Sequence, residues 1–147
     1  MTIKELYAYL TVKNVEAAVA FYRDVFGATE IFRLVEPSGR IGHTEVQFGT
    51  AVLMVSEEFP EYDLLGPQEG VRLPMRLHIH VDDADATVAA ALAAGATLVR
   101  PIKDEFYGER GGMVRDPFGY DWLIGHSIEE MSPEEMQRRY TELMAGG

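Results

Sequence analysis

Two stretches of the chain follow the same order of local patterns, and this repeat constrains the fold more than any other feature. Each copy runs from an alternating apolar strand through a short polar step into a helical stretch. The strands span residues 7–12 and 76–81, and the helical stretches span residues 15–26 and 84–94. Each helical stretch ends at a Gly-Ala-Thr triplet, which begins at Gly27 and again at Gly95. Such a repeat predicts two copies of one supersecondary unit.

The ends of the two predicted helices carry the residues that helix ends favour. Asn14 and Asp83 can accept hydrogen bonds from the free N–H groups of the first turn. Gly27 and Gly95 can adopt the left-handed conformation that ends a helix. Apolar residues of the first helix recur at helical spacing and form one stripe: Val15, Ala18, Val19, Tyr22, Val25 and Phe26. In the alanine-rich second helix we expect Val88 and Leu92 to be the main anchors.

Three strands are predicted after each helix, so the repeated unit is βαβββ and the fold class is α+β. The strands are expected at residues 29–35, 42–48 and 51–56, and at residues 96–102, 112–115 and 120–126. The whole chain, residues 1–147, is interpreted as one domain. Its parts are module 1 at about 5–58, a linker at 59–73, module 2 at about 74–126 and a C-terminal helix at 132–144. Ser132 opens this last helix with a capping-box pattern, and its apolar stripe is expected to pack on the body or on a second subunit.

Composition excludes several classes of function. The chain has no cysteine, which rules out disulfides and thiolate metal sites. Its net charge of −11 argues against nucleic acid and against anionic membrane surfaces as partners. No apolar run is long enough for a membrane helix, and the N-terminus lacks a secretory pattern. We therefore expect a cytoplasmic protein that binds neither nucleic acid nor membrane.

Strand alternation places a distinctive set of side chains on the face of the sheets that points away from the helices. On the predicted first strand of each module these are Tyr7 and Tyr9, and Arg76, His78 and His80. His43 and Glu45 share the same face of the strand at 42–48. Aromatic, imidazole and guanidinium groups together suit a concave pocket that stacks on an organic molecule and hydrogen-bonds it.

The order of these motifs resembles the vicinal oxygen chelate superfamily, which includes glyoxalase I, bleomycin-resistance proteins and extradiol dioxygenases. The resemblance covers about residues 5–126 and rests on KNVEAAVAFY at 13–22, FGA at 26–28 and DPFGY at 116–120. The fragments GRIGHTE at 39–45 and DEFYGER at 104–110 are similar to its PhnB-like branch. The resemblance implies paired modules whose sheets curl into a partly open barrel, often within a homodimer.

In metal-binding members of this superfamily the ligands come from the first and fourth strands of each module. Matching by motif places those positions on Tyr7, Met54, Arg76 and Leu123. None is a usual ligand for the harder divalent ions, because arginine keeps its proton and methionine prefers copper(I). A displaced divalent-metal site from His43, Glu45, His78 and His80 is the alternative. We disfavour it because same-face neighbours on a strand lie about 7 Å apart.

Three functional hypotheses remain open, and the third and simplest of them is a dimeric scaffold with no small-molecule role. In the first, the chain is a metal-free module that binds a small organic ligand. Tyr7, Tyr9, Phe106 and Tyr107 would stack on it, and Arg76 and Arg110 would contact an anionic group. Met54, His78, His80 and Leu123 complete the predicted ligand-binding set. In the second, the chain is a lyase, isomerase or dioxygenase-type enzyme that uses His43, Glu45 and His78, or a divalent metal, in catalysis.

Overall fold

The computed structural model describes residues 1–146, and they form two compact units. Unit 1 comprises residues 1–74 together with 117–120, and unit 2 comprises residues 75–116 together with 121–146. Each unit carries one four-stranded sheet of its own.

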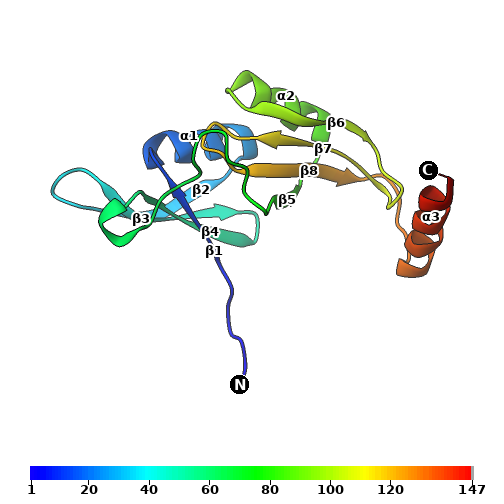
Figure 1. Ribbon diagram of the computed structural model, residues 1–147, viewed down its shortest axis with the longest axis horizontal. Coiled ribbons are helices and arrows are strands. Elements are labelled where there is room, and N and C mark those ends of the chain that lie inside the picture. The colour runs from blue at the N-terminus through cyan, green and yellow to red at the C-terminus, as the bar shows by residue number, and fades with distance from the viewer. Residues whose placement is uncertain (147) are drawn as a thin grey trace. The chain divides into compact units, whose positions relative to one another are not determined.

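Unit 1 contains the first copy of the repeat. Its elements are β1 (Ala8–Val12), α1 (Val15–Phe26), β2 (Thr29–Val35), β3 (Ile41–Phe48), β4 (Ala51–Glu57) and the short 3-10 helix η1 (Pro60–Tyr62). The sheet has the strand order β1-β4-β3-β2 (Figure 1). β1 runs parallel to β4, and the other neighbouring strands are antiparallel.

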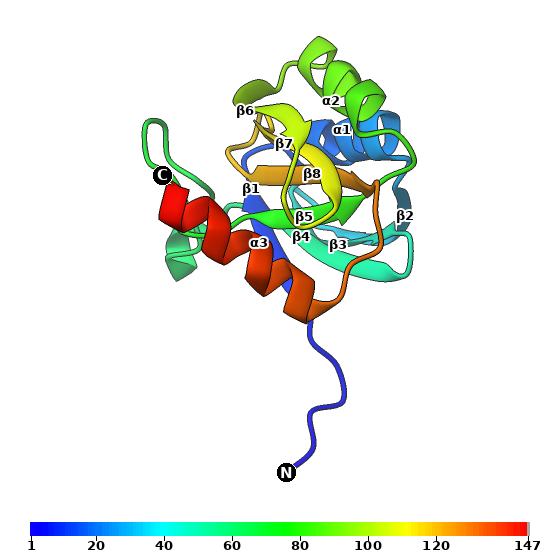
Figure 2. The ribbon, with the colours of Figure 1, turned by 90° about the vertical axis from the view of Figure 1, so that its right-hand side faces the viewer.

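Unit 2 contains the second copy and the C-terminal helix. Its elements are β5 (Leu77–His80), α2 (Ala84–Ala93), β6 (Thr97–Asp104), β7 (Glu109–Arg115), β8 (Asp121–Ser127) and α3 (Pro133–Gly146). The strand order β5-β8-β7-β6 repeats that of unit 1, again with one parallel and two antiparallel pairs. α2 packs against this sheet and covers one of its faces (Figures 1 and 2). The predicted α+β class, the two βαβββ modules and the C-terminal helix are confirmed.

Helix ends follow the predicted chemistry at all but one position. Asn14 accepts a hydrogen bond from the Ala17 amide, and Asp83 accepts one from the Ala86 amide. Gly27 ends α1 in the left-handed conformation, with φ of 70°. α2 differs slightly, because its cap is Ala94 and the left-handed residue, Gly95, comes one position later.

Tyr22 is fully buried in the core of unit 1, together with Val15 and Ala18 of the same helix. Opposite them the sheet contributes its own buried residues: Leu10, Val12, Thr44, Val46 and Val55. Rings of α1 also meet Phe118, and Phe21 packs edge-on against it at 6.1 Å between centroids. The hydroxyl of Tyr120 donates to the Thr11 carbonyl and accepts from the Thr11 amide, which holds the segment 117–120 on β1.

Trp122 anchors the core of unit 2 and is 1% exposed. Its indole N–H donates to the buried carboxylate of Asp116 at 2.8 Å. The expected anchors of α2 are half right. Val88 is buried, but Leu92 is 38% exposed and Ala91 is buried in its place. The alanine-lined side of the helix faces the sheet, and Leu92 lies on the solvent-exposed side.

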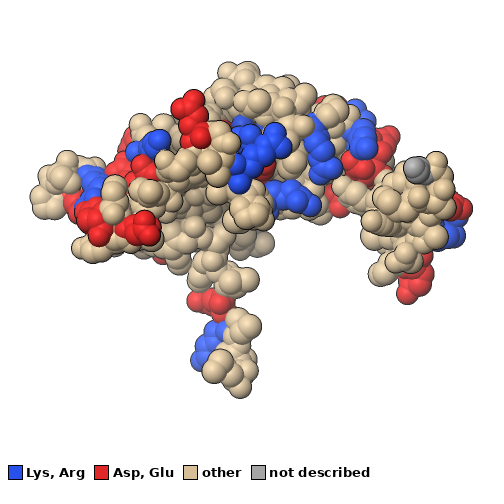
Figure 3. All heavy atoms as spheres, viewed as in Figure 1, with Lys and Arg blue, Asp and Glu red and all other residues tan. Residues whose placement is uncertain are grey.

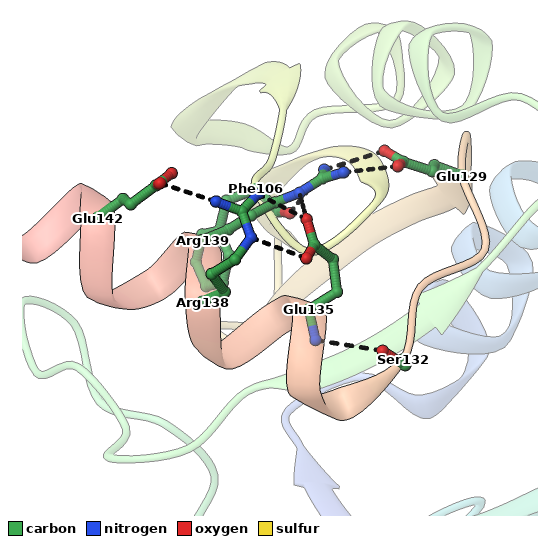
Figure 4. A network of polar contacts seen from close by, with 7 residues as sticks. All are labelled: Phe106, Glu129, Ser132, Glu135, Arg138, Arg139 and Glu142. Atoms are coloured by element: carbon green, nitrogen blue, oxygen red, sulfur yellow. Dashed lines mark hydrogen bonds and ion pairs between the residues drawn. The ribbon is translucent and has the colours of Figure 1, made fainter.

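α3 is held to unit 2 by charges more than by apolar contact, since none of its described residues is buried. Glu135 pairs with Arg138 and Arg139, and Arg139 pairs in turn with Glu129 (Figure 4). Acidic and basic side chains therefore lie next to each other on this helix (Figure 3). The Ser132 hydroxyl accepts from the Glu135 amide, so the predicted cap is present. None of the helices among residues 1–146 is long and apolar enough to span a membrane.

Candidate functional site

Tyr9, His43 and Glu45 form a hydrogen-bonded series on the face of the unit 1 sheet opposite α1, and we call them the unit 1 triad. The Tyr9 hydroxyl lies 2.6 Å from Nδ1 of His43, and Nε2 of His43 lies 3.0 Å from Glu45. The Tyr9 ring is 53% exposed, whereas the side chains of His43 and Glu45 are only 19% and 24% exposed. Two half-buried polar groups therefore hold one exposed aromatic ring.

Charge fixes the direction of these hydrogen bonds. A carboxylate oxygen accepts, so Nε2 of His43 donates to Glu45. Nδ1 then accepts from the phenol of Tyr9. Burial and the negative charge of Glu45 raise the pKa of Tyr9 above its ordinary value of 10.0. The phenol is therefore neutral at pH 7, and its oxygen still has lone pairs for a ligand.

Other residues of unit 1 extend this surface. Met54 lies between Tyr9 on β1 and Glu45 on β3 in the sheet register, and it is half-buried. The ring of Phe32, on β2, lies 5.6 Å from the imidazole of His43 and is 43% exposed. Tyr7 lies just before β1 and is also exposed. The exposed surface around Tyr9 is thus mostly aromatic and sulfur-containing.

In unit 2, His78, His80 and Glu109 come together on the sheet face opposite α2, and we call them the unit 2 cluster. Nε2 of His80 lies 2.7 Å from Oε1 of Glu109, and Nε2 of His78 lies 3.4 Å from the same oxygen. The two imidazole rings lean together, with centroids 4.9 Å apart. The sequence argument that these histidines are too far apart to chelate one ion is therefore wrong, because side-chain rotation brings their rings closer than their backbone positions.

Unit 2 has two hollows, and the larger of them borders this cluster. One, of about 590 Å³, is lined by His80, Glu109, Tyr107, Met131 and Met136 among others. Burial, and then the charges of Glu105 and Glu109, raise the pKa of Tyr107. The second hollow, of about 110 Å³, lies against Leu123 and is bordered by Arg100 and Lys103. Unit 2 thus offers concave, mixed polar and apolar surface beside the cluster.

Two residues that were expected to contact a ligand are engaged elsewhere, and a third is exposed. Arg110 forms ion pairs with Asp85 at the start of α2 and with Asp104, so its charge is already paired on the helix side of the sheet. Phe106 packs edge-on against Tyr140 of α3 at 5.5 Å between ring centroids. Arg76 lies just before β5, is exposed and pairs with no carboxylate among residues 1–146.

Comparison with known proteins places the fold in a family. Residues 5–124 match the model of the Glyoxalase/Bleomycin resistance protein/Dioxygenase superfamily. The chain belongs to this superfamily. A relative in it, the uncharacterized protein Mb0911c of Mycobacterium bovis, is 32% identical over 135 residues, which cover 90% of this chain and 89% of the relative.

Solved structures share the fold at lower identity. TioX from Micromonospora sp. ML1 is 25% identical, with a TM-score of 0.63, and the match covers 88% of this chain and 100% of that one. The PhnB protein from Bacillus cereus is 13% identical, with a TM-score of 0.67 over 84% of this chain and 100% of that one. At 13% identity the second likeness concerns the fold alone.

The positions at which superfamily members hold a metal do not fit one in this chain. In the sheets, Met54 lies opposite Tyr9, and Leu123 lies opposite His78. Tyr7 and Arg76, which motif matching placed there, precede the strands. Even with the observed register, the set contains one imidazole, and neither Met54 nor Leu123 offers the oxygen or nitrogen donor that harder ions need.

Sequence reasoning missed Glu109 and Phe32 as neighbours of the predicted histidines. The predicted strand began at 112, whereas β7 begins at Glu109, so the carboxylate seemed to lie in a loop. Glu109 is also 29 residues from His80 in the chain. The signal that could have found it is Gly125, where the absence of a side chain leaves room for the Glu109 carboxylate.

Proposed function

We propose that the chain binds a planar small organic molecule on the unit 1 face centred on Tyr9. The observation that carries this proposal is the unit 1 triad. One hydrogen bond to His43 holds the phenol in one orientation while its ring stays exposed, which is how a preorganised stacking surface is built. A satisfied structural tyrosine would more often have its ring covered.

The chemistry of the face suggests what such a ligand looks like. Tyr9, Phe32 and Met54 offer aromatic and thioether contact to a flat ring. The phenol oxygen of Tyr9, whose hydrogen is engaged with His43, offers an acceptor to a ligand O–H or N–H group. Glu45 adds negative charge nearby. A flat molecule with a hydrogen-bond donor therefore suits this face better than a flat anion.

A matched pair of fluorescent probes tests the proposal. 2-Naphthol is planar and carries a donor, whereas naphthalene-2-sulfonate is planar and anionic. We expect 2-naphthol to bind more tightly, and Tyr9→Ala to weaken its binding roughly fivefold to tenfold, as loss of one aromatic contact does. Tyr62→Ala removes a tyrosine from η1 that is more exposed than Tyr9, at 72% against 53%, and should change nothing. Equal affinities for the wild type and Tyr9→Ala refute the proposal.

This binding needs no metal ion, because the triad is held together by direct hydrogen bonds between its own side chains. Treatment with EDTA is expected to leave the affinity for 2-naphthol unchanged. A loss of affinity that added Zn²⁺ restores contradicts the metal-free proposal at this face.

An enzymatic role is the second candidate, and the same triad favours it. When a carbon acid lies against Tyr9, its proton can pass to the phenol oxygen while the phenol proton passes to Nδ1 of His43. The electron pair stays on the substrate carbon, and Glu45 stabilises the imidazolium that forms. Dihydroxyacetone in D₂O is a simple probe: loss of its C–H signal should be faster with wild type than with His43→Ala. Equal rates exclude this relay.

We propose that the chain assembles as a homodimer. We also propose that it belongs to the PhnB-like branch of the superfamily. The dimer is supported by exposed apolar side chains on α3, since Tyr140, Leu143 and Met144 are 41%, 52% and 59% exposed. Light scattering after gel filtration should give twice the chain mass, and Leu143→Glu should shift it to the monomer mass. A monomeric wild type contradicts the dimer. A cytoplasmic location stays a prediction from the sequence.

A further inference from the structure

We propose that His78, His80 and Glu109 form a binding site for a divalent first-row transition-metal ion within unit 2. This inference does not depend on the proposed ligand site of unit 1, because all three residues belong to unit 2 and no organic ligand is needed for its test. It also differs from the four positions at which superfamily members hold a metal, since His78 alone lies opposite one of them and His80 and Glu109 occupy none.

Geometry is the first support. The ligand atoms of the three side chains all lie within 4.8 Å of one another. Around one tetrahedral Zn²⁺, neighbouring ligand atoms are separated by about 3.3 Å, given bond lengths near 2.0 Å. The Nε2 atom of His78 already lies 3.4 Å from Oε1 of Glu109. Small side-chain rotations would therefore bring all three atoms to bonding distance of one ion.

The glycine at position 125 is the second, independent support. β8 lies between β5 and β7, and Gly125 on it is the direct partner of both His80 and Gly111. A Cβ at Gly125 would lie 3.1 Å from Oε1 of Glu109. The missing side chain therefore leaves the gap through which the carboxylate reaches across β8 to the two histidines.

Two neutral histidines could also donate their Nε2 protons to one carboxylate oxygen, and this is the simplest alternative. Such an arrangement leaves both imidazoles on the surface, where His78 and His80 are 40% and 63% exposed in their side chains. It would add little stability in that setting. Convergence of both Nε2 atoms on one oxygen is better explained by an ion that all three groups share.

The donor set selects the kind of ion. Two imidazoles and one carboxylate suit Zn²⁺, Fe²⁺, Co²⁺ or Ni²⁺, whereas Mg²⁺ and Ca²⁺ prefer oxygen alone. Three protein ligands leave further coordination positions for water, as in catalytic rather than structural zinc sites. His80 and Glu109 also line the hollow of about 590 Å³, which has room for such water.

Zn²⁺ itself is the probe. Untagged full-length protein is stripped with EDTA, transferred to metal-free buffer and titrated with Zn²⁺ in competition with a chromophoric chelator. We expect one Zn²⁺ per chain in the wild type. His80→Ala and Glu109→Gln should each weaken binding by at least about tenfold, as loss of a metal-site group does. Glu142→Gln makes the same carboxylate-to-amide change on α3 and should bind as the wild type does.

Gly125→Ala provides a variant that keeps all three ligands. Its methyl group should displace the Glu109 carboxylate and weaken Zn²⁺ binding while circular dichroism shows the fold unchanged. Visible absorption of Co²⁺-loaded protein gives a second readout, with bands present in the wild type and lost in Glu109→Gln. The proposal is overturned if the wild type binds Zn²⁺ no more tightly than Glu109→Gln, or if His80→Ala retains the full affinity.

Discussion

The phenol oxygen of Tyr9 lies 2.6 Å from Nδ1 of His43, and this contact joins β1 to β3 across the polar face of unit 1. Because β4 lies between these two strands, the hydrogen bond spans the width of one strand, and Met54 of β4 lies beside it in the register. The ring of Tyr9 is thereby fixed on one side and exposed on the other.

Removing only the hydroxyl separates the two roles of Tyr9. Tyr9→Phe keeps the ring but deletes the hydrogen bond to His43, so we expect the free energy of unfolding to fall by roughly 0.5–1 kcal/mol. Affinity for 2-naphthol should fall less than in Tyr9→Ala, since most of the stacking surface is kept. Urea denaturation and fluorescence titration measure the two effects. A Tyr9→Phe variant that binds as weakly as Tyr9→Ala would show that the hydroxyl, not the ring, dominates.

The raised pKa of Tyr9 predicts how its phenol titrates. Burial and Glu45 disfavour the phenolate, so the folded-state pKa lies above 10.0. The stabilisation linked to this shift is complete below pH 10 and is lost as the pH rises through the folded pKa. Phenolate absorbance of the wild type minus that of Tyr9→Phe isolates this residue. Its midpoint should lie above pH 10, and a midpoint at or below pH 10 contradicts the assigned electrostatics.

The indole of Trp122 tests the core of unit 2. Trp122→Phe deletes the donor to the buried carboxylate of Asp116 and leaves space where the larger ring packed. We expect a loss of roughly 2–4 kcal/mol in the free energy of unfolding. Tyr62→Phe, on the surface of η1, should stay within about 0.5 kcal/mol of the wild type. Similar urea midpoints for the two variants would argue against the packing described.

Glu135 should make the stability of α3 depend on acid pH. Hydrogen bonds from Arg138 and Arg139 lower the pKa of Glu135 from 4.5 to about 2. A lowered folded-state pKa gives stabilisation that is present above pH 4.5 and lost as the pH falls towards 2. At pH 7, Glu135→Gln should therefore show less helical circular dichroism than the wild type, and the difference should shrink over this window. If the wild type and Glu135→Gln gave identical helical signals at pH 7, the ion pairs of Glu135 would have no structural role.

Local chemistry explains why so much of the fold could be predicted. The Asn14 and Asp83 caps, the Gly27 stop and the strand at 29–35 depend on residues close in sequence, and the structure has them as predicted. The prediction that Leu92 anchors α2 was wrong. A helix of alanines has no strong apolar face, so packing against the sheet decided which side is buried.

The unit 2 cluster could be predicted only in part, for a different reason. His78 and His80 alternate on one short strand, so their shared face was evident. Their approach to Glu109 depends on the strand order β5-β8-β7 and on the gap at Gly125. Strand order and pairing register are set by contacts between distant parts of the chain, and no local pattern specifies them.

Native mass spectrometry of untagged protein, purified without denaturation, tests ligand binding at Tyr9 most directly. We predict that the wild type carries an additional small-molecule mass that is released on unfolding, and that Tyr9→Ala loses this mass while Tyr62→Ala keeps it. A wild type without any bound small molecule, or a Tyr9→Ala variant that carries the same mass as the wild type, would contradict the account.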